Sequence, residues 1–150
     1  MTKKLKIPDK ACWKGYDADL DVKYLCNLFF GKSVEEVQQY FGGTQSIERM
    51  DELLFSPRCV FQYYVHAFAK FVMSQKAIGD PDSASPFLSL LEAREKRDPG
   101  SVKDIYKSLS ETVEFVASHQ EYFDADVNIY GDFRERADRI RELCMPETHR

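Results

Sequence analysis

The sequence predicts an all-α fold, and two features of the chain support this prediction. Apolar residues recur three and four positions apart over most of its length, which is the spacing of one helix face. Alternating apolar runs joined by Asn-Gly or Asp-Gly turns, which indicate hairpins, do not occur in the 150 residues. A chain of this length with 43% hydrophobic residues forms a full core in one domain. We therefore expect a single bundle-like domain of about six or seven helices.

The ends of the chain differ in composition from its middle. The first sixteen residues carry five lysines and one acid, Asp9, and Pro8 disfavours an early helix. Trp13 and Tyr16 are expected to attach this segment partly to the domain. No apolar stretch follows it, as one would in a secretory signal. The expected division is a basic extension over 1–16, an all-helical domain over 17–145 and a C-terminal tail over 146–150.

Three short helices are expected before the middle of the chain. Asp17 or Asp19 caps the first helix, which ends at Gly31. Ser33 and Glu36 have the spacing of a capping box and begin the second, and a third follows it. In the first helix Leu20, Tyr24 and Leu28 form the expected buried stripe, and Leu25 with Phe29 widens it. In the third helix the expected positions are Ile47, Met50, Leu53 and Leu54.

The central helix of the fold is predicted between residues 57 and 78. Ser56 is a suitable N-cap, and Pro57 suits the first helical position. Apolar residues lie nearly all round this segment, and a helix of that kind is buried. They are Val60, Phe61, Tyr64, Val65, Phe68, Phe71 and Val72. Such an aromatic helix also fits a seam between two copies of the chain, so a homo-oligomer stays open.

Three further helices are predicted after this one. The turns Asp80-Pro-Asp-Ser and Asp98-Pro-Gly-Ser each precede a helix, and the last helix runs from about Tyr130 to Leu143. The clearest helical periodicity of the chain lies between the second turn and the last helix, at Val102, Ile105, Tyr106, Leu109, Val113, Val116, Gln120 and Phe123.

The cysteine pattern and the charge favour a cytoplasmic protein. The four cysteines are widely spaced, with no Cys-x-x-Cys pair and no zinc-ligand spacing, so reduced thiols are expected at Cys12, Cys26, Cys59 and Cys144. No run approaches the roughly 20 apolar residues of a membrane span. The net charge of −4 argues against general nucleic-acid binding, which needs a basic patch.

No catalytic or cofactor motif occurs in the chain, so we expect neither an enzyme nor a cofactor. Phosphate-loop, dinucleotide, nucleophile-elbow and His-Glu-x-x-His patterns are all missing. The one polar stripe of the central helix carries Cys59, Tyr63, His66 and Lys70, but two helical turns, about 10 Å, separate Cys59 from His66. An enzyme built on these residues and a DNA-binding regulator are kept as alternatives, although the acidic helix after Gly43 does not suit DNA phosphates.

A second alternative is calcium binding by residues 124–135. Oxygen-bearing side chains fall at positions 1, 3, 5, 9 and 12 counted from Asp124, as in a helix–loop–helix calcium site. Position 6 of such a loop requires glycine, whereas this chain has the β-branched Ile129. The favoured interpretation is therefore a connection whose acids cap the next helix, with no metal.

Acidic residues are concentrated late in the chain. No lysine or arginine occurs between Lys107 and Arg134, while six acids do: Glu111, Glu114, Glu121, Asp124, Asp126 and Asp132. Phe115 and Tyr122 lie off the main apolar stripe of their helix, on a face shared with Glu111. Aromatic anchors among carboxylates are typical of a protein-binding surface. We interpret these eight residues as the candidate partner-binding site.

The sequence therefore favours a non-catalytic cytoplasmic binding module whose partner is a protein with a basic surface. This physical profile is that of an immunity or antitoxin protein that blocks a basic toxin such as a nuclease. The likeness is one of profile, because no family motif supports it and a fold alone does not fix a function. Binding to nucleic acid or to a membrane is not expected.

Overall fold

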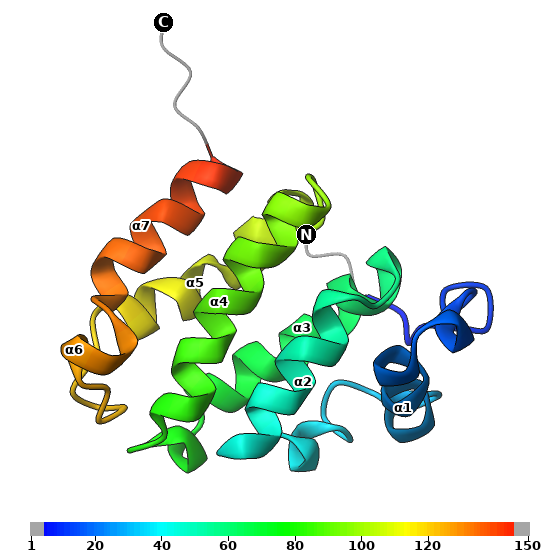
Figure 1. The fold of residues 1–150 in the computed structure, drawn as a ribbon, viewed down its shortest axis with the longest axis horizontal. Helices are drawn as coiled ribbons and strands as arrows, with labels where there is room; N and C mark the ends of the chain where they lie inside the picture. Colours follow the sequence, from blue (N-terminus) through cyan, green and yellow to red (C-terminus); the bar gives the residue numbers. More distant parts are fainter. Residues whose placement is uncertain (1–4, 146–150) are drawn as a thin grey trace, which may run out of the picture.

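The computed structural model describes residues 5–145, and it is helical with short 3₁₀ and irregular connections and no strand among these residues (Figure 1). The seven α-helices are α1 (Leu20–Phe29), α2 (Thr44–Leu54), α3 (Arg58–Met73), α4 (Pro81–Arg97), α5 (Tyr106–Ala117), α6 (Val127–Tyr130) and α7 (Phe133–Cys144). Of these, α6 is a single turn. The expected all-α bundle of six or seven helices is confirmed.

The helices form one bundle with α1 and α6 at opposite ends (Figure 1). Helix α4 packs between α2 and α7, α5 packs against α3 and α7, and α1 packs against α2. None of the described helices is both long and apolar enough to cross a membrane. The C-terminal tail and the first part of the basic extension lie outside the described residues.

Helix α3 is the buried central helix that its composition predicts. Phe61, Tyr64 and Phe68 are each 0% exposed. The Tyr64 hydroxyl is within hydrogen-bond distance of the carbonyls of Phe29 and Lys32, at 2.8 and 2.7 Å, so its polar atom is satisfied inside the core. The helix stops at Met73, and a separate 3₁₀ turn, Gln75–Ala77, completes the segment that the sequence assigns to one helix.

Helix α1 begins where the sequence predicts but buries a different face. Asp19 caps it by accepting from the backbone N–H groups of Asp21 and Val22, at 2.8 and 3.2 Å. The expected stripe is wrong at Leu20 and Tyr24, which are 83% and 51% exposed, and right at Leu25 and Phe29, which are buried. The buried residues are Val22, Leu25, Cys26 and Phe29. The helix carries two apolar stripes with the same spacing, and its packing selects the second.

The capping box forms, but the helix expected after it does not. The Ser33 N–H donates to the Glu36 carboxylate at 2.8 Å, and the Glu36 N–H donates to the Ser33 hydroxyl at 3.1 Å. The chain then makes only turns and a 3₁₀ helix, Gln38–Tyr40. The Gln38 side chain donates to the Ala67 carbonyl of α3 at 3.0 Å, which holds this segment as a tight turn on the central helix.

Two buried charged residues of α4 hold the neighbouring loops. Arg94 is 4% exposed, and its guanidinium donates to the carbonyls of Leu53 and Leu54 at the end of α2 and of Ser56 beyond it, at 3.1, 2.9 and 2.7 Å. Glu95 is 6% exposed and accepts three backbone N–H groups of the loop after α4, those of Gly100, Val102 and Lys103. These bonds satisfy helix ends that would otherwise be unpaired in the interior.

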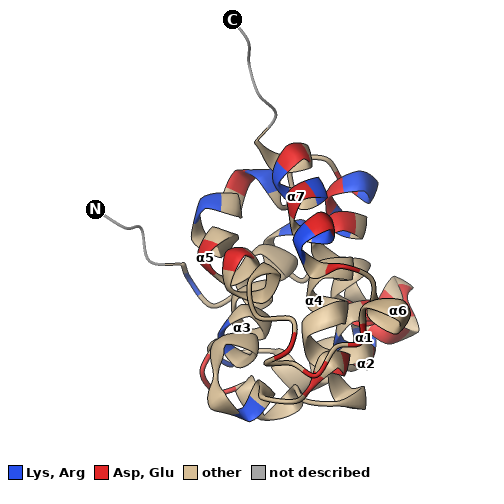
Figure 2. Ribbon diagram, turned by 90° about the vertical axis from the view of Figure 1, so that its left-hand side faces the viewer, with Lys and Arg blue, Asp and Glu red and all other residues tan. Residues whose placement is uncertain are grey.

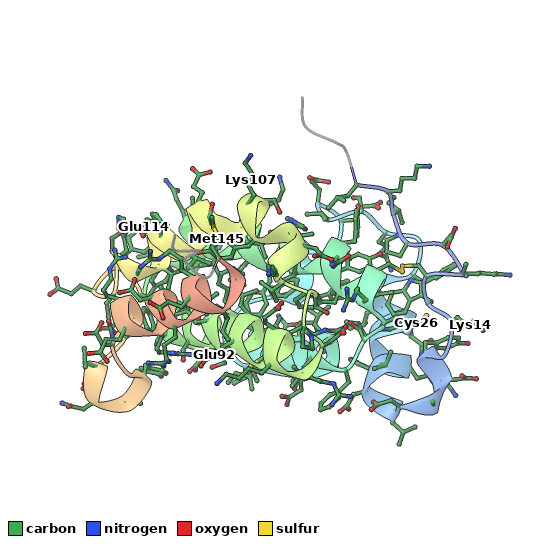
Figure 3. All side chains as sticks on the ribbon, turned by 90° about the horizontal axis from the view of Figure 1, so that it is seen from above. Lys14, Cys26, Glu92, Lys107, Glu114 and Met145 are labelled. Carbon is green, nitrogen blue, oxygen red and sulfur yellow. A yellow bond between two sulfur atoms is a disulfide. The ribbon has the colours of Figure 1, made fainter. Side chains whose placement is uncertain are left out.

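The expectation of four reduced cysteines is wrong for two of them. Cys12 and Cys59 form a disulfide with a Cα–Cα distance of 5.8 Å, visible as the yellow bond in Figure 3. Cys26 and Cys144 are free and buried. The two cysteines are 47 residues apart, so no local sequence pattern predicts the bond. Trp13, which is 1% exposed, anchors the N-terminal segment in the core and brings Cys12 to the start of α3.

Candidate functional site

One corner of the molecule is built where α6 packs on the start of α4. The Tyr130 hydroxyl donates to the Asp82 carboxylate at 3.1 Å, and the Gly79 N–H donates to the Tyr122 carbonyl at 2.8 Å. The Arg136 guanidinium donates to the Tyr130 carbonyl at 2.8 Å and to the Ser85 carbonyl at 2.9 Å. The loop that carries α6 is therefore fixed to α4 on both sides.

This corner combines three exposed acids and the half-buried Asp82 with exposed apolar side chains. Val127 is 53% exposed and Ile129 is 72% exposed. We call the surface the acidic corner and define it as Asp82, Glu121, Asp124, Asp126, Val127 and Ile129. Red segments border α6 in Figure 2, whereas α7 alternates red and blue. Within residues 5–145, no lysine or arginine forms an ion pair with an acid of the corner.

The backbone of the corner explains why polar residues stand there. Asp124 has a φ of 57°, a left-handed conformation that aspartate and asparagine tolerate better than most residues. Asp126 caps α6 by accepting from the Asn128 N–H at 2.8 Å. Burial raises the pKa of the Tyr130 phenol, and the hydrogen bond to Asp82 raises it further, with the charges of Asp80 and Asp124 acting in the same direction.

The aromatic residues of the predicted site lie in a stack beside the corner. Phe115 and Tyr122 are both half-buried. The Phe115 ring stacks on the His119 ring with centroids 4.0 Å apart and meets the Tyr122 ring edge-on at 5.4 Å. Phe123, which is fully buried, contacts both rings. Phe115 and Tyr122 thus pack largely on each other and on neighbouring rings. The apolar groups that project at the corner are Val127 and Ile129.

The other predicted acids lie apart from the corner or are already paired. Glu114 forms a two-pronged ion pair with Arg134, at 3.0 and 2.6 Å, and Arg134 lowers the pKa of its carboxyl. Asp132 caps α7 by accepting from the backbone N–H of Arg134 at 2.8 Å. Glu111 lines a separate cavity against α3. The structure thus brings Glu121, Asp124 and Asp126 together and separates the remaining three.

The segment proposed as a calcium loop has another geometry. Residues 127–130 form α6 inside it, and Gly131, with a φ of 79°, ends that turn. Asp126 and Asp132 cap α6 and α7, as the favoured interpretation predicts. In the part of the chain that the structure describes, no group of three or more His, Cys, Asp or Glu side chains is placed to hold a metal ion.

The polar stripe of α3 does not converge on one site. Cys59 is in the disulfide, and the Tyr63 hydroxyl accepts from the Val34 N–H at 3.1 Å in the interior. His66 and Lys70 do line a cavity of about 310 Å³, where His66 Nε2 lies 2.7 Å from Ser108 Oγ. Burial lowers the pKa of the His66 imidazole. Ser108 comes from α5, and no spacing in the sequence connects it to α3.

Sequence reasoning missed three residues of the acidic corner. The exposure of Val127 and Ile129 could have been predicted from the sequence. A one-turn helix between an N-cap and Gly131 can bury only one side, and Tyr130 occupies that side. No local pattern predicted Asp82, since it lies 48 residues before its partner Tyr130. No protein-family model matches the chain, and neither a curated protein nor a solved structure shows significant similarity to it.

Proposed function

We propose that this protein is a non-catalytic binding module that docks a basic protein partner on the acidic corner. The observation that carries the proposal is the pairing of exposed Val127 and Ile129 with carboxylates that no ion pair within residues 5–145 neutralises. Apolar side chains supply area that a partner desolvates, while surrounding charge of one sign selects a partner of the other sign and speeds encounter.

A rigid surface supports the same proposal. The bonds of Tyr130 to Asp82 and of Gly79 to Tyr122 hold the corner before any partner arrives. A surface that is already ordered loses little conformational entropy on binding, so more of the contact energy appears as affinity.

The partner class that fits is a basic protein whose active surface must be covered, as in the immunity or antitoxin profile. A nuclease is one such partner, because its phosphate-binding surface is cationic. The product of a gene beside the one that encodes this chain is the first candidate to test. The cytoplasmic location expected from the sequence depends on reduced cysteines. The Cys12–Cys59 bond instead favours a location in an oxidising compartment.

The test is affinity capture with variants that keep the fold of the corner. The triple variant Glu121→Gln, Asp124→Asn and Asp126→Asn removes three charges, and asparagine retains both the left-handed backbone and the helix cap. A matched control, Asp17→Asn, Asp21→Asn and Asp51→Asn, removes the same charge from exposed positions before α3. A partner captured by the wild type and the control, but lost by the corner variant, is the expected result.

The apolar half of the surface is tested separately with Ile129→Ser. Burying an isoleucine in an interface contributes about 1.5–3 kcal/mol, so affinity should fall at least tenfold. Leu20→Ser is the matched control, because Leu20 is 83% exposed and belongs to α1, at the other end of the molecule. Equal capture by all variants would show that the acidic corner is not the binding surface.

A further inference from the structure

A second cavity lies at the opposite end of the molecule, between the N-terminal segment and α1. Its volume is about 670 Å³, and its lining residues are Lys10, Trp13, Lys14, Gly15, Tyr16, Cys26, Asn27 and Phe30. This volume falls in the range of small-molecule sites, which are about 300–1,000 Å³. Figure 3 shows Lys14 and Cys26 at the α1 end of the structure, far from Glu114. The cavity is therefore independent of the acidic corner and of the function proposed for it.

The wall of this cavity is held in place covalently. Cys12 lies within the lining segment and is bonded to Cys59, next to the start of α3. Trp13 packs beneath the same segment with a ring-centroid distance of 6.1 Å to Tyr64. A disulfide and a buried indole thus fix a stretch of chain that forms turns over residues 10–15 and then a short 3₁₀ helix, Tyr16–Ala18. A preformed wall of this kind lowers the entropic cost of binding a ligand.

The lining combines apolar surface with positive charge. Tyr16 and Phe30 present aromatic rings in front of the nearly buried Trp13. Burial raises the pKa of the Cys26 thiol, which keeps that wall uncharged. Lys10 and Lys14 are exposed, and within residues 5–145 neither forms an ion pair with a carboxylate. The two ammonium groups are the only charged side chains among the lining residues.

A further polar group belongs to the same wall. The Trp13 indole Nε1 is the one buried side-chain nitrogen or oxygen without a hydrogen-bond partner among the residues that the structure describes. An unmade hydrogen bond in the interior destabilises the folded state. Because Trp13 is 1% exposed, this nitrogen is not open to a ligand in the cavity, and the folded wall itself carries the cost.

We propose that this cavity binds a small carboxylic acid with an apolar body, held at its carboxylate by Lys10 and Lys14. The apolar body packs on the aromatic rings of the wall, and the carboxylate oxygens accept from the two ammonium groups. The positive charge of the two lysines selects an anion. Each ammonium group can donate hydrogen bonds to it, and no carboxylate among the lining residues competes for them. Either an aliphatic or an aromatic acid meets this description, and the two are separated by the choice of probe.

The test uses the fluorescence of Trp13, which is the only tryptophan in the chain. Octanoate and 4-phenylbutyrate are the acidic probes, and 1-octanol and octyltrimethylammonium are the neutral and cationic controls. We expect saturable emission changes and a raised melting temperature with at least one acid, and binding at least tenfold weaker with both controls. The proposal is overturned if neither acid binds, or if octanol binds as tightly as octanoate.

Variants separate the charge of the site from its shape. Lys10→Gln with Lys14→Gln should weaken acid binding about tenfold, as expected for lost charge-assisted hydrogen bonds. Lys23→Gln with Lys76→Gln changes the net charge equally outside the lining and should change affinity less than about twofold. Asn27→Phe, at an exposed lining position, should block the cavity while the circular dichroism spectrum stays unchanged. Unaltered binding in the first variant or in Asn27→Phe would contradict the proposed site.

Discussion

The Tyr130 hydroxyl donates to the Asp82 carboxylate at 3.1 Å and so joins α6 to the first turn of α4 across 48 residues of sequence. Because α6 is a single turn, it has little stability of its own, and this bond with its neighbours decides where Val127 and Ile129 stand. The acidic corner is therefore a tertiary feature that depends on a side-chain contact.

Loss of this contact should loosen the corner without unfolding the domain. Tyr130→Phe removes the hydroxyl and leaves the ring, and we expect a cost of about 1 kcal/mol in the free energy of unfolding. Hydrogen exchange of residues 124–131 should quicken, while exchange in α3 stays slow. Unchanged exchange in this segment would show that Asp82 does not hold α6.

Arg94 should be among the most sensitive positions of the fold. Its side chain is 4% exposed and donates to three carbonyls at the C-terminal end of α2, so Arg94→Ala leaves those acceptors unpaired. The expected loss is about 3 kcal/mol or more, measured by urea denaturation. Arg97→Ala, at an exposed neighbour that lies over the Phe55 ring, should cost about 1 kcal/mol or less. Similar losses in both variants would refute this role of Arg94.

The disulfide should contribute measurably to stability. For two cysteines 47 residues apart, the chain-entropy model gives a stabilisation of about 4 kcal/mol. Reduction should therefore lower the melting temperature of the wild type but leave that of Cys12→Ser with Cys59→Ser unchanged. Thiol titration of the denatured, unreduced protein should find Cys26 and Cys144 alone, and four reactive thiols would contradict the bond.

Asp98 should make stability depend on pH at the acidic end. The Arg58 guanidinium, which donates to it at 2.6 Å, lowers the pKa of this carboxyl, and Ser101 and Arg94 lower it further. A carboxyl whose pKa is lower in the folded state stabilises above its unfolded pKa, and that contribution is lost as pH falls. Asp98→Asn should thus lower the melting temperature at pH 7, with the difference from the wild type shrinking below about pH 4. A difference that stays constant down to pH 2.5 would exclude this pairing as the cause.

Local signals predicted most of the fold because they act within one turn of helix. The cap at Asp19 forms as the sequence predicts, and so does the buried character of α3. The errors arose where packing chose between equal local options. Leu20 and Val22 belong to two stripes of the same periodicity, and packing on α2, the N-terminal segment and Tyr64 of α3 buries the second. The capping box at Ser33 formed without its helix because Gln38 bonds α3 instead.

The candidate site could be predicted only in part, for a related reason. The acidic window identified Glu121, Asp124 and Asp126 as neighbours, because they lie within one loop. It could not show that Arg134 neutralises Glu114, since that pair joins two helices. Nor could the sequence show that the N-terminal segment closes a cavity on α1. That segment is held by a disulfide to a cysteine 47 residues away, and helical periodicity does not reveal such a pairing.

The most direct test of the acidic corner is the salt dependence of association with a captured partner. Stopped-flow or surface-based association rates should be measured from 50 to 500 mM NaCl for the wild type, the corner triple variant and the triple control. Electrostatic steering predicts rates that fall steeply with salt for the wild type and the control, and a slower, nearly flat profile for the corner variant. Identical salt profiles for all three proteins would contradict the proposed binding surface.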